Sequence, residues 1–517
     1  MVDPLPYMTY QPFLPEVAAG SIEERHAVVS HRRHLKKTNV VLGKVTNVNH
    51  AKKTATIAVE GAPDIQFKYD HIVVTAGAVS RTFPIPGVAD VCIGLKNIEE
   101  AVEVRNRIFA NFDKAANLPA GAARSRLLTF VVVGGGFAGI EAFAEMRSLA
   151  SYLVKKYDNI SFDEVKFHLI EAMGRIMPEV SLETSQWVLA NLDGRSAKVH
   201  LNTQLQSAVG GNVELSTGEK FSSDCIVWTA GVMANPVVRA TDLPLDDRGR
   251  ITAHPSLRVI NGDKIVEGAW TAGDVSAVPD LSGGGVGGFC VPNAQHAVRQ
   301  AKLLAPNLVA TLRGQGVKDY FHKNLGAVAG LGIGHGVYQW RNLAIKGFPA
   351  WVMHRGYHGL AIPMWERKLR VFTGWAWNWI VKRDLVSIMA VKTPRLAFET
   401  YASRPAAAPA AKAPATKAVA KKTTTTKAVV KKAPAAKPAA KKAAPKKPAV
   451  KKPAVKKTTA TKTTAKKPAA NKTKPSAEAL YKMTEVAAYY IALNDGFAGN
   501  PSDYWLAAEI QIKKLHK

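Results

Sequence analysis

The stretch FVVVGGGFAGIEAFAEM, residues 130–146, decides the fold class. An apolar run leads into the pattern Gly134-x-Gly136-x-x-Gly139, and a second apolar segment carrying Glu141 follows it. In such a pattern the first glycine allows a tight turn, the second lets backbone N–H groups approach a pyrophosphate, and the third lets a helix pack close to a strand. Glycine-rich turns are frequent, so the pattern alone is weak evidence. Here the flanking residues predict a strand before the turn and a helix after it, as a nucleotide-binding turn requires.

Other apolar segments extend this unit into a sheet. Short strands are expected within residues 38–87, including the buried run HIVVTAG at 71–77, and a helix is expected from Asn97 to about Ala116. A long helix to about Tyr157 should follow the glycine turn, and VKFHLIE at 165–171 should form the next strand. Strands and helices that alternate in this way predict an α/β fold with a parallel sheet.

Three expected strands end in the same tripeptide. Thr75 to Gly77, Thr229 to Gly231 and Thr271 to Gly273 each read Thr-Ala-Gly, and the strands before the last two are CIVW and AW. Chance is the alternative, since Ala and Gly are common. Because ligands of doubly wound sheets bind at the carboxyl ends of the strands, the repetition predicts cofactor contacts at Thr75, Gly77, Gly231 and Gly273.

Glu171 lies at the end of the strand after the glycine turn. A carboxylate at that place can accept hydrogen bonds from both ribose hydroxyls and repel a 2′-phosphate, which favours NADH over NADPH. A solvated acid at a strand end is the alternative, and the nearby Arg175 leaves the cofactor preference open.

Net charge is +30 over 517 residues, but it is concentrated in one segment. Residues 405–475 contain 21 Lys and no Asp or Glu, which leaves +9 for the rest of the chain. The Ala/Lys/Pro/Thr repeats of this segment cannot form a core and are expected to be disordered.

The three cysteines, Cys92, Cys225 and Cys290, are far apart and form no C-x-x-C pair. This spacing supports neither a disulfide framework, nor a redox dithiol, nor a zinc cluster, and no metal is expected. A reducing cytoplasmic setting fits best. No signal peptide and no run of eighteen uninterrupted apolar residues is found, so a spanning helix is not expected.

Composition changes again near the C-terminal end. Residues 343–388 combine five tryptophans with Arg, Lys and His, which suits either an amphipathic segment at a membrane surface or an ordinary packed helix pair. Apolar periodicity returns from Leu480 to Leu515 and predicts a small helical hairpin.

Taken in order, the motifs from Val2 to about Ile388 resemble the type II NADH:quinone oxidoreductases, single-subunit flavoenzymes with two dinucleotide-binding domains. Seven stretches carry the resemblance: YQPFLPEVAAG (10–20), TAGAVSRTFPIPGV (75–88), GLKNIEEAVEVRNRI (94–108), GGGFAGIEAFAEM (134–146), WTAGV (228–232), TAGDVSAVP (271–279) and CVPNAQHAVRQAK (290–302). It implies that hydride passes from NADH to FAD and that electrons then pass to a quinone.

The resemblance also implies roles for single residues. Gly273 and Asp274 should meet the FAD, with a turn-capping role as the alternative for Asp274. Gln295 and Gln300 should lie beside the flavin and the quinone, because amides can bond a quinone carbonyl without adding charge. A structural hydrogen bond is the preferred role for His296. Glu141 should lie near nicotinamide and flavin and relay protons to the quinone; compensation of the helix dipole is its alternative.

In the family an earlier strand and glycine turn bind the ADP half of FAD, and the next strand ends in an acid. Val2-Asp3-Pro4 resembles that second strand end, so Asp3 should be a ribose ligand. The earlier turn has no counterpart in the sequence, which leads to the expectation that Met1 is an internal start; a genuine fragment with weak FAD binding is the alternative.

The expected architecture has two Rossmann-like doubly wound domains, one inserted in the other. The FAD-binding domain should comprise 1–118 and 262–330, the NADH-binding domain 119–261, a membrane-surface region 331–400, a disordered linker 401–477 and a helical module 478–517.

The expected function is that of an FAD-dependent NADH:quinone oxidoreductase bound peripherally at the cytoplasmic face of a bacterial membrane. Its expected partners are NADH, a quinone, an anionic membrane surface and a second copy of the chain, with nonspecific nucleic acid at the Lys-rich segment as a further possibility. A flavin-deficient tethering protein and another pyridine-nucleotide flavin oxidoreductase are the alternatives.

Overall fold

The computed structural model describes residues 1–194, 197–283, 285–386, 395, 484, 487–488, 491 and 500–515. The chain divides into two compact units, Met1–Lys392 and Thr393–Lys517.

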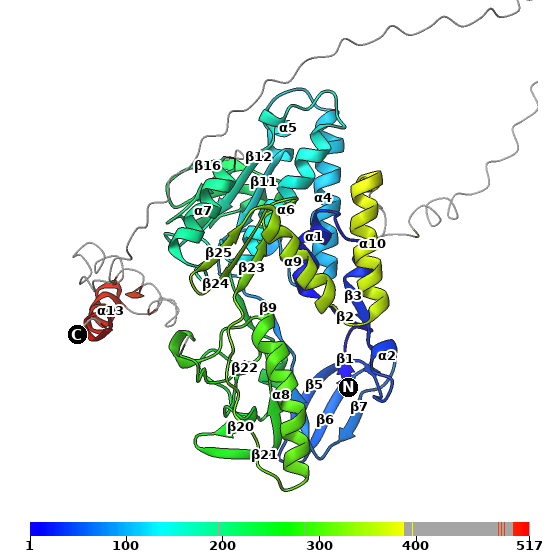
Figure 1. Ribbon diagram of the computed structural model, residues 1–517, viewed down its shortest axis with the longest axis vertical. Coiled ribbons are helices and arrows are strands. Elements are labelled where there is room, and N and C mark those ends of the chain that lie inside the picture. The colour runs from blue at the N-terminus through cyan, green and yellow to red at the C-terminus, as the bar shows by residue number, and fades with distance from the viewer. Residues whose placement is uncertain are drawn as a thin grey trace, which may run out of the picture. The chain divides into compact units, whose positions relative to one another are not determined.

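A five-stranded parallel sheet forms the centre of one half of the first unit (Figure 1). Its strands lie in the order β10 (Cys92–Ile93), β17 (Cys225–Trp228), β11 (Thr129–Val133), β12 (Lys166–Ile170) and β13 (Lys198–His200). All five residues of β11 are buried, because this strand has a neighbour on each side and a layer on each face. The predicted strand, glycine turn and helix are confirmed here.

Helices cover one face of this sheet and strands cover the other. Phe130 and Val132 of β11 pack in one apolar cluster with residues of α4 (Ile98–Ala116), α6 (Phe137–Val154) and α7 (Leu182–Asp193). Val131 and Val133 point the opposite way, into a cluster with an antiparallel meander of β14 (Leu205–Ser207), β15 (Asn212–Leu215) and β16 (Lys220–Ser222). Asn97 caps α4 through a capping box with Glu100, so this helix begins where the sequence predicted.

The other half of the unit contains the remaining strands of the α/β fold. β21 (Lys264–Thr271) lies between β20 (Arg258–Asn261) and β8 (Ile72–Val74), and α8 (Ala294–Leu312) lies beside them (Figure 1). β5 (Lys44–Asn49), β6 (Thr54–Ala58) and β7 (Ile65–Lys68) form an antiparallel sheet, and β1 (Val2–Asp3) pairs with β4 (Val41–Leu42). An antiparallel pair, β9 (Ala78–Ser80) with β18 (Val232–Ala234), connects the two halves.

The expectation that HIVVTAG is a buried run is wrong. Val73, at the centre of β8, is 41% exposed, and its neighbours in the strand are half-buried. Within the described ranges β8 pairs only with β21, and β1 pairs only with β4. Each of these strands therefore keeps one unpaired edge, and an edge strand buries less of its side chains.

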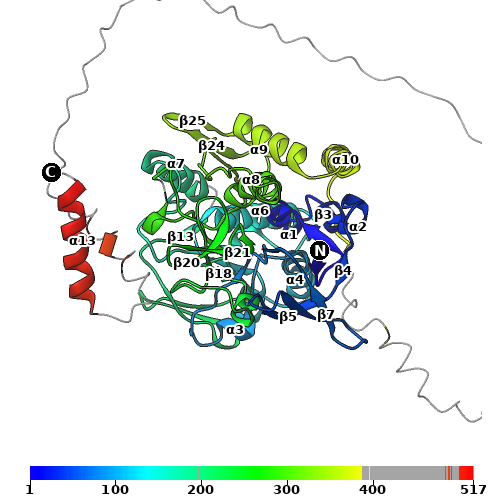
Figure 2. The ribbon, with the colours of Figure 1, turned by 90° about the horizontal axis from the view of Figure 1, so that it is seen from below.

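The segment after residue 326 forms a small sheet and two helices. β23 (Ala327–Gly330), β24 (Gly336–Trp340) and β25 (Leu343–Lys346) are antiparallel, and α9 (Phe348–Ala361) packs on them. α10 (Trp365–Val381) follows, and both helices lie at one edge of the unit in the view from below (Figure 2). None of the helices in the described part of the chain combines the length and apolarity that a membrane crossing needs.

In the second unit, α13 (Pro501–Leu515) contributes Tyr504 and Ala508 to a small cluster with Ala488. The predicted disordered linker at 401–477 lies outside the described residues, as does part of the predicted hairpin at 480–515. The short elements of the first unit are α1 (Leu14–Ala18), α2 (His31–His34), α3 (Val88–Val91), α5 (Ala122–Leu127), β2 (Tyr7–Thr9), β3 (Val28–Ser30), β19 (Ile251–Thr252) and β22 (Ser276–Ala277).

Candidate active site

The glycine turn between β11 and α6 has the shape that its sequence predicted. Gly134 adopts φ +110°, a conformation that residues with a side chain rarely adopt. A Cβ on Gly139 would lie 1.9 Å from the carbonyl oxygen of Gly134, so helix and turn are in direct backbone contact there. Around Gly136 nothing lies within 4 Å of an added Cβ, so its backbone faces open space at the start of α6. The turn can therefore accept an anion at the helix N-terminus.

The end of β17 closes one side of this turn. The Thr229 hydroxyl donates to the carbonyl oxygen of Val133 at 2.8 Å, which ties the ends of the two strands together. Gly231, two residues further on, has φ +134° and open space around its missing side chain. The structure thus brings the Thr229 to Gly231 tripeptide and the glycine turn to the same edge of the sheet.

Glu171 also reaches the glycine turn. It is 8% exposed, and its Oε2 accepts a hydrogen bond from the Gly135 backbone N at 2.5 Å while Oε1 accepts one from Met173 N at 2.8 Å. Burial raises the pKa of Glu171, and these backbone donors oppose the shift. Arg175 donates to the Val180 carbonyl oxygen at 2.5 Å. Glu171 is therefore not a solvated acid at a strand end.

The end of β21 forms the centre of the predicted flavin site. Gly273 has φ +79°, and its backbone N donates to Oε1 of Gln300 at 2.7 Å. Gln300 is 1% exposed, so in this structure it holds the Gly273 turn against α8. The role of Gln300 as a quinone contact stays a prediction.

Asp274 has a carboxylate that accepts no hydrogen bond from any described residue. Its side chain is 15% exposed and lies 4.0 Å from Lys96 Nζ. Burial raises the pKa of Asp274, and the charge of Lys96 opposes this shift. A half-buried carboxylate that lacks a donor fits a ligand that brings hydroxyl groups, as the ribityl chain of FAD does.

The remaining predicted residues lie at strand ends and at the start of α8. Thr75 is exposed, and Gly77 has φ +69° with open space around it. Asp3 ends β1, accepts from Leu5 N at 2.8 Å and lies 3.4 Å from Nε2 of His31. Gln295 donates to the Gly326 carbonyl oxygen at 3.1 Å and accepts from Arg299 at 3.0 Å.

His296 has the structural role that the sequence favoured. Its ring is buried, and Nδ1 lies 3.1 Å from the Tyr320 hydroxyl. Its backbone N donates to the capping side chain of Asn293 at 2.9 Å.

Glu141 has a partner that the sequence did not reveal. Its Oε1 accepts from Gly330 N at 2.9 Å and lies 3.0 Å from Nε2 of His354 on α9. Burial lowers the pKa of His354, but the hydrogen bond and charge of Glu141 outweigh this, so the pKa of His354 is raised. This contact favours a role for Glu141 beyond compensation of the helix dipole.

Two more titratable side chains continue from this pair. The rings of His354 and His358 lie 4.7 Å apart, and Nδ1 of His358 lies 3.0 Å from the Tyr10 hydroxyl. Burial, with the charge of His354, lowers the pKa of His358 to about 3, and burial raises the pKa of Tyr10. Tyr10, His358, His354 and Glu141 thus form a row from the residue before η1 (Gln11–Phe13) to α6. The sequence contained no spacing that links these positions, because they come from separate elements.

A buried ionic layer joins α9 and α10 to the core. Arg355 on α9 lies 3.2 Å from Glu16 Oε2, which also accepts from Trp375 Nε1 of α10 at 2.9 Å. Arg383 lies 3.8 Å from Glu145 on α6. Burial and the charge of Glu16 raise the pKa of Glu145, while both arginines oppose the shift.

Comparison with known families gives a match over the region described above. A family model described as "Pyridine nucleotide-disulphide oxidoreductase" matches residues 3–301, which is more than half of the chain. Residues 479–514 match a second model, described as a protein of unknown function.

Similar sequences include two named NADH dehydrogenases. The chain is 27% identical over 391 residues to a type II NADH:quinone oxidoreductase of Mycobacterium tuberculosis, covering 72% of this chain and 81% of the other. It is 26% identical over 396 residues to a probable NADH dehydrogenase of Dictyostelium discoideum, covering 75% and 85%. Among solved structures, NDH2 from Plasmodium falciparum in complex with NADH has a TM-score of 0.69 at 17% identity and covers 75% of this chain and 94% of that one.

Proposed function

The chain belongs to the pyridine nucleotide-disulphide oxidoreductase family, and from that premise we propose that it is an FAD-dependent NADH:quinone oxidoreductase. The observation that carries the proposal is the convergence of the Gly136 turn, the Glu171 carboxylate and the end of β17 at one sheet edge, in a chain whose named relatives are NADH:quinone oxidoreductases. A bound flavin supplies the capacity to accept a hydride and to pass electrons on one or two at a time.

The residues that would hold NADH are those of the β11–α6 turn. Gly136 leaves room for backbone N–H groups to meet the pyrophosphate, and Gly139 lets α6 start directly behind it. We assign Glu171 to the ribose hydroxyls; binding would exchange its bond to Gly135 N for bonds to the sugar.

The residues that would hold FAD lie in 1–118 and 262–330, which we propose as its domain, with 119–261 as the NADH domain. Asp274 offers a carboxylate without a donor, and Gly77 offers open backbone at the end of β8. Asp3 at the end of β1 would accept from the adenosine ribose.

Quinone reduction also needs protons, and the row of side chains behind Glu141 can supply them. With its raised pKa, His354 retains a proton next to Glu141, while His358 behind it stays neutral. Proton transfer from His354 to Glu141 and onward would deliver a proton to the quinone. His358 and Tyr10 lie behind His354, and we propose this side as the route by which His354 regains a proton. Gln295 is the proposed amide contact of the quinone carbonyl.

A quinone lies in lipid, and α9 and α10 give the enzyme a surface to reach it. Both helices expose large apolar side chains to solvent, with Trp379 at 88% and Trp365 at 73%. Lys368 and Arg370 lie in the same helix α10, so apolar rings and cations occur together. We propose that this surface binds the headgroup region of an anionic membrane, at the cytoplasmic face of a bacterial cell. Other exposed apolar residues of the pair are Phe348, Val352, Met353, Tyr357, Leu360, Leu369, Phe372, Trp377, Ile380 and Val381.

The Lys-rich segment and self-association stay predictions. The 21 Lys of residues 405–475 support nonspecific binding to anionic lipid or nucleic acid, with steep salt dependence. Light scattering at several protein concentrations checks the expected homodimer.

Cysteine chemistry distinguishes this proposal from a disulphide reductase. Cys92, Cys225 and Cys290 are all free, and burial raises the pKa of Cys290 to about 11. A dithiol reaction needs two neighbouring thiols with accessible thiolates, so Cys290 is best explained by packing.

The test is NADH-dependent reduction of menadione by the full chain supplied with FAD, with Gln295→Ala and Glu141→Gln as variants. We expect turnover in the wild type and slower quinone reduction in both variants, while NADH still binds. A protein that binds DNA or vesicles but never reduces quinone would favour the tethering alternative.

A further inference from the structure

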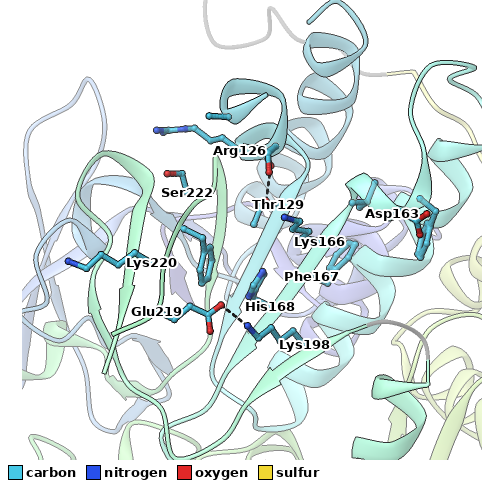
Figure 3. A pocket seen from close by; sticks show the side chains of 15 residues that line it. Arg126, Thr129, Asp163, Lys166, Phe167, His168, Lys198, Glu219, Lys220 and Ser222 are labelled. Atoms are coloured by element: carbon cyan, nitrogen blue, oxygen red, sulfur yellow. Dashed lines mark hydrogen bonds and ion pairs between the residues drawn. The ribbon is translucent and has the colours of Figure 1, made fainter. Parts of the chain in front are cut away.

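A cavity of about 700 Å³ lies on the meander side of the five-stranded sheet, at the amino ends of its strands (Figure 3). Thr129, Lys166 and Lys198 begin β11, β12 and β13 and line it, so it lies at the edge of the sheet opposite the glycine turn. Nothing in the proposed oxidoreductase function uses this place.

Two buried histidines and a glutamate meet beside this cavity. His168 of β12 and His200 of β13 lie on the same face of neighbouring parallel strands, and His168 Nδ1 is 3.0 Å from His200 Nε2. Glu219, in the turn before β16, brings its Oε2 to 3.8 Å from His200 Nδ1. One ligating atom from each of the three residues can be chosen so that all lie within 4.8 Å of one another.

The separation between His168 Nδ1 and His200 Nε2 is close to the spacing of two ligands on one metal ion. Glu219 approaches the other ring nitrogen of His200, so its carboxylate would have to turn toward this pair to complete the site. A tetrahedral zinc ion with bonds of about 2.0–2.2 Å holds its donor atoms about 3.4 Å apart, and two imidazoles with one carboxylate are a common zinc donor set. Phe221 of β16 stacks on the face of the His168 ring at 4.1 Å and so does not cover its nitrogens; a metal ion would replace the contact between His168 Nδ1 and His200 Nε2. The adjoining cavity offers space for water as a fourth ligand.

A neighbouring ammonium group opposes a cation at this cluster. Lys198 Nζ lies 2.6 Å from Glu219 Oε1 and competes with a metal for that carboxylate (Figure 3). A metal would have to displace this ammonium group.

We propose that His168, His200 and Glu219 form a binding site for a divalent transition-metal ion of the zinc type, which fastens the β14–β16 meander to the sheet. Since His168 and His200 belong to the sheet and Glu219 to the meander, one ion would cross-link two layers that otherwise meet through apolar contacts and the Lys198–Glu219 ion pair.

The experiment is calorimetric titration of the metal-free full chain with zinc chloride, together with its thermal unfolding. We expect one zinc per chain and a zinc-dependent rise in Tm. We expect His168→Gln and Glu219→Gln to weaken binding at least tenfold, and Lys198→Met to tighten it because the competing ammonium group is gone. Lys198 is exposed, so Lys198→Met should stay folded, and an unchanged circular dichroism spectrum checks this. A gain of affinity in the folded variant tests the site even where His168→Gln unfolds.

His34→Gln, at an exposed histidine on α2, is the matched control and should bind zinc as the wild type does. The proposal is overturned if wild type and Glu219→Gln give the same isotherm, or if Lys198→Met leaves the affinity unchanged.

Discussion

Gly136 and Gly139 lie in the same turn but have different surroundings. At Gly139 an added Cβ would meet the Gly134 carbonyl oxygen at 1.9 Å, whereas at Gly136 it would meet nothing within 4 Å. Gly139 is therefore required by the fold, and Gly136 by the ligand.

This difference gives a matched pair of variants. Gly139→Ala should cost about 1–3 kcal/mol of unfolding free energy, as overpacking does, and should also weaken NADH binding. Gly136→Ala should leave unfolding unchanged but weaken NADH binding, because its Cβ occupies the path of the pyrophosphate. Urea denaturation and NADH titration measure the two quantities. Equal loss of stability in both variants would contradict this view of the turn.

His354 should make stability depend on pH. Since pairing with Glu141 raises the pKa of His354, the stabilisation is fully present below the ordinary pKa of about 6.5 and is lost as pH rises through the folded-state pKa. In the wild type the free energy of unfolding should decline above about pH 6.5, and this contribution should be absent in His354→Gln. The decline should amount to about 1.4 kcal/mol for each unit by which the pKa of His354 is raised. Urea denaturation between pH 6 and pH 9 checks this, with His34→Gln as control. Identical slopes in wild type and His354→Gln would show that the pair carries no proton-linked energy.

At the scale of elements, α9 and α10 carry the prediction of membrane binding. Trp365→Ser with Trp379→Ser removes two rings that are 73% and 88% exposed. A buried large apolar side chain contributes about 1.5–3 kcal/mol, so the double variant should bind anionic vesicles at least about tenfold more weakly. Leu182→Ser on α7, where Leu182 is 55% exposed, is the control and should not change sedimentation with vesicles. If the control loses as much binding as the tryptophan variant, the surface has been assigned to the wrong elements.

Elements with a strong local pattern could be predicted from the sequence. Asn97 and Glu100 mark the start of α4, and the β11–turn–α6 unit lies where its glycines placed it. The predicted long helix ends at Val154, three residues before Tyr157. Burial of β8 could not be predicted, because the exposure of Val73 depends on which strand lies next to it rather than on its own apolarity.

Contacts between elements could not be predicted from the sequence. Glu141 and His354 meet only because α9 packs on β23, and the sequence between them is unrelated to that contact. The same holds for His168 and Glu219, which are brought together by a meander whose strands are too short to give a clear pattern. Gln300 was predicted to lie beside the flavin and the quinone, and its hydrogen bond to the backbone N of Gly273 appears only in the fold.

At the scale of the whole molecule, the chain divides into two units, and the second contains the Lys-rich segment. A chain ending at Lys392 should keep NADH-dependent quinone reduction, because every proposed site residue lies in the first unit. It should lose retention on plasmid DNA, since the Lys-rich segment is gone. Enzyme assays and gel shifts on the two chains measure this, and DNA binding that persists after truncation would place the basic surface in the first unit instead.

The most direct measurement of the central claim follows NADH oxidation and quinone reduction together in the full chain supplied with FAD. The account predicts that one quinone is reduced for each NADH oxidised, and that Gly136→Ala raises the NADH concentration required while the flavin spectrum is unchanged. The account is contradicted if Gly136→Ala reduces quinone at the same NADH concentration as the wild type. It is also contradicted if the chain binds NADH but never reduces quinone.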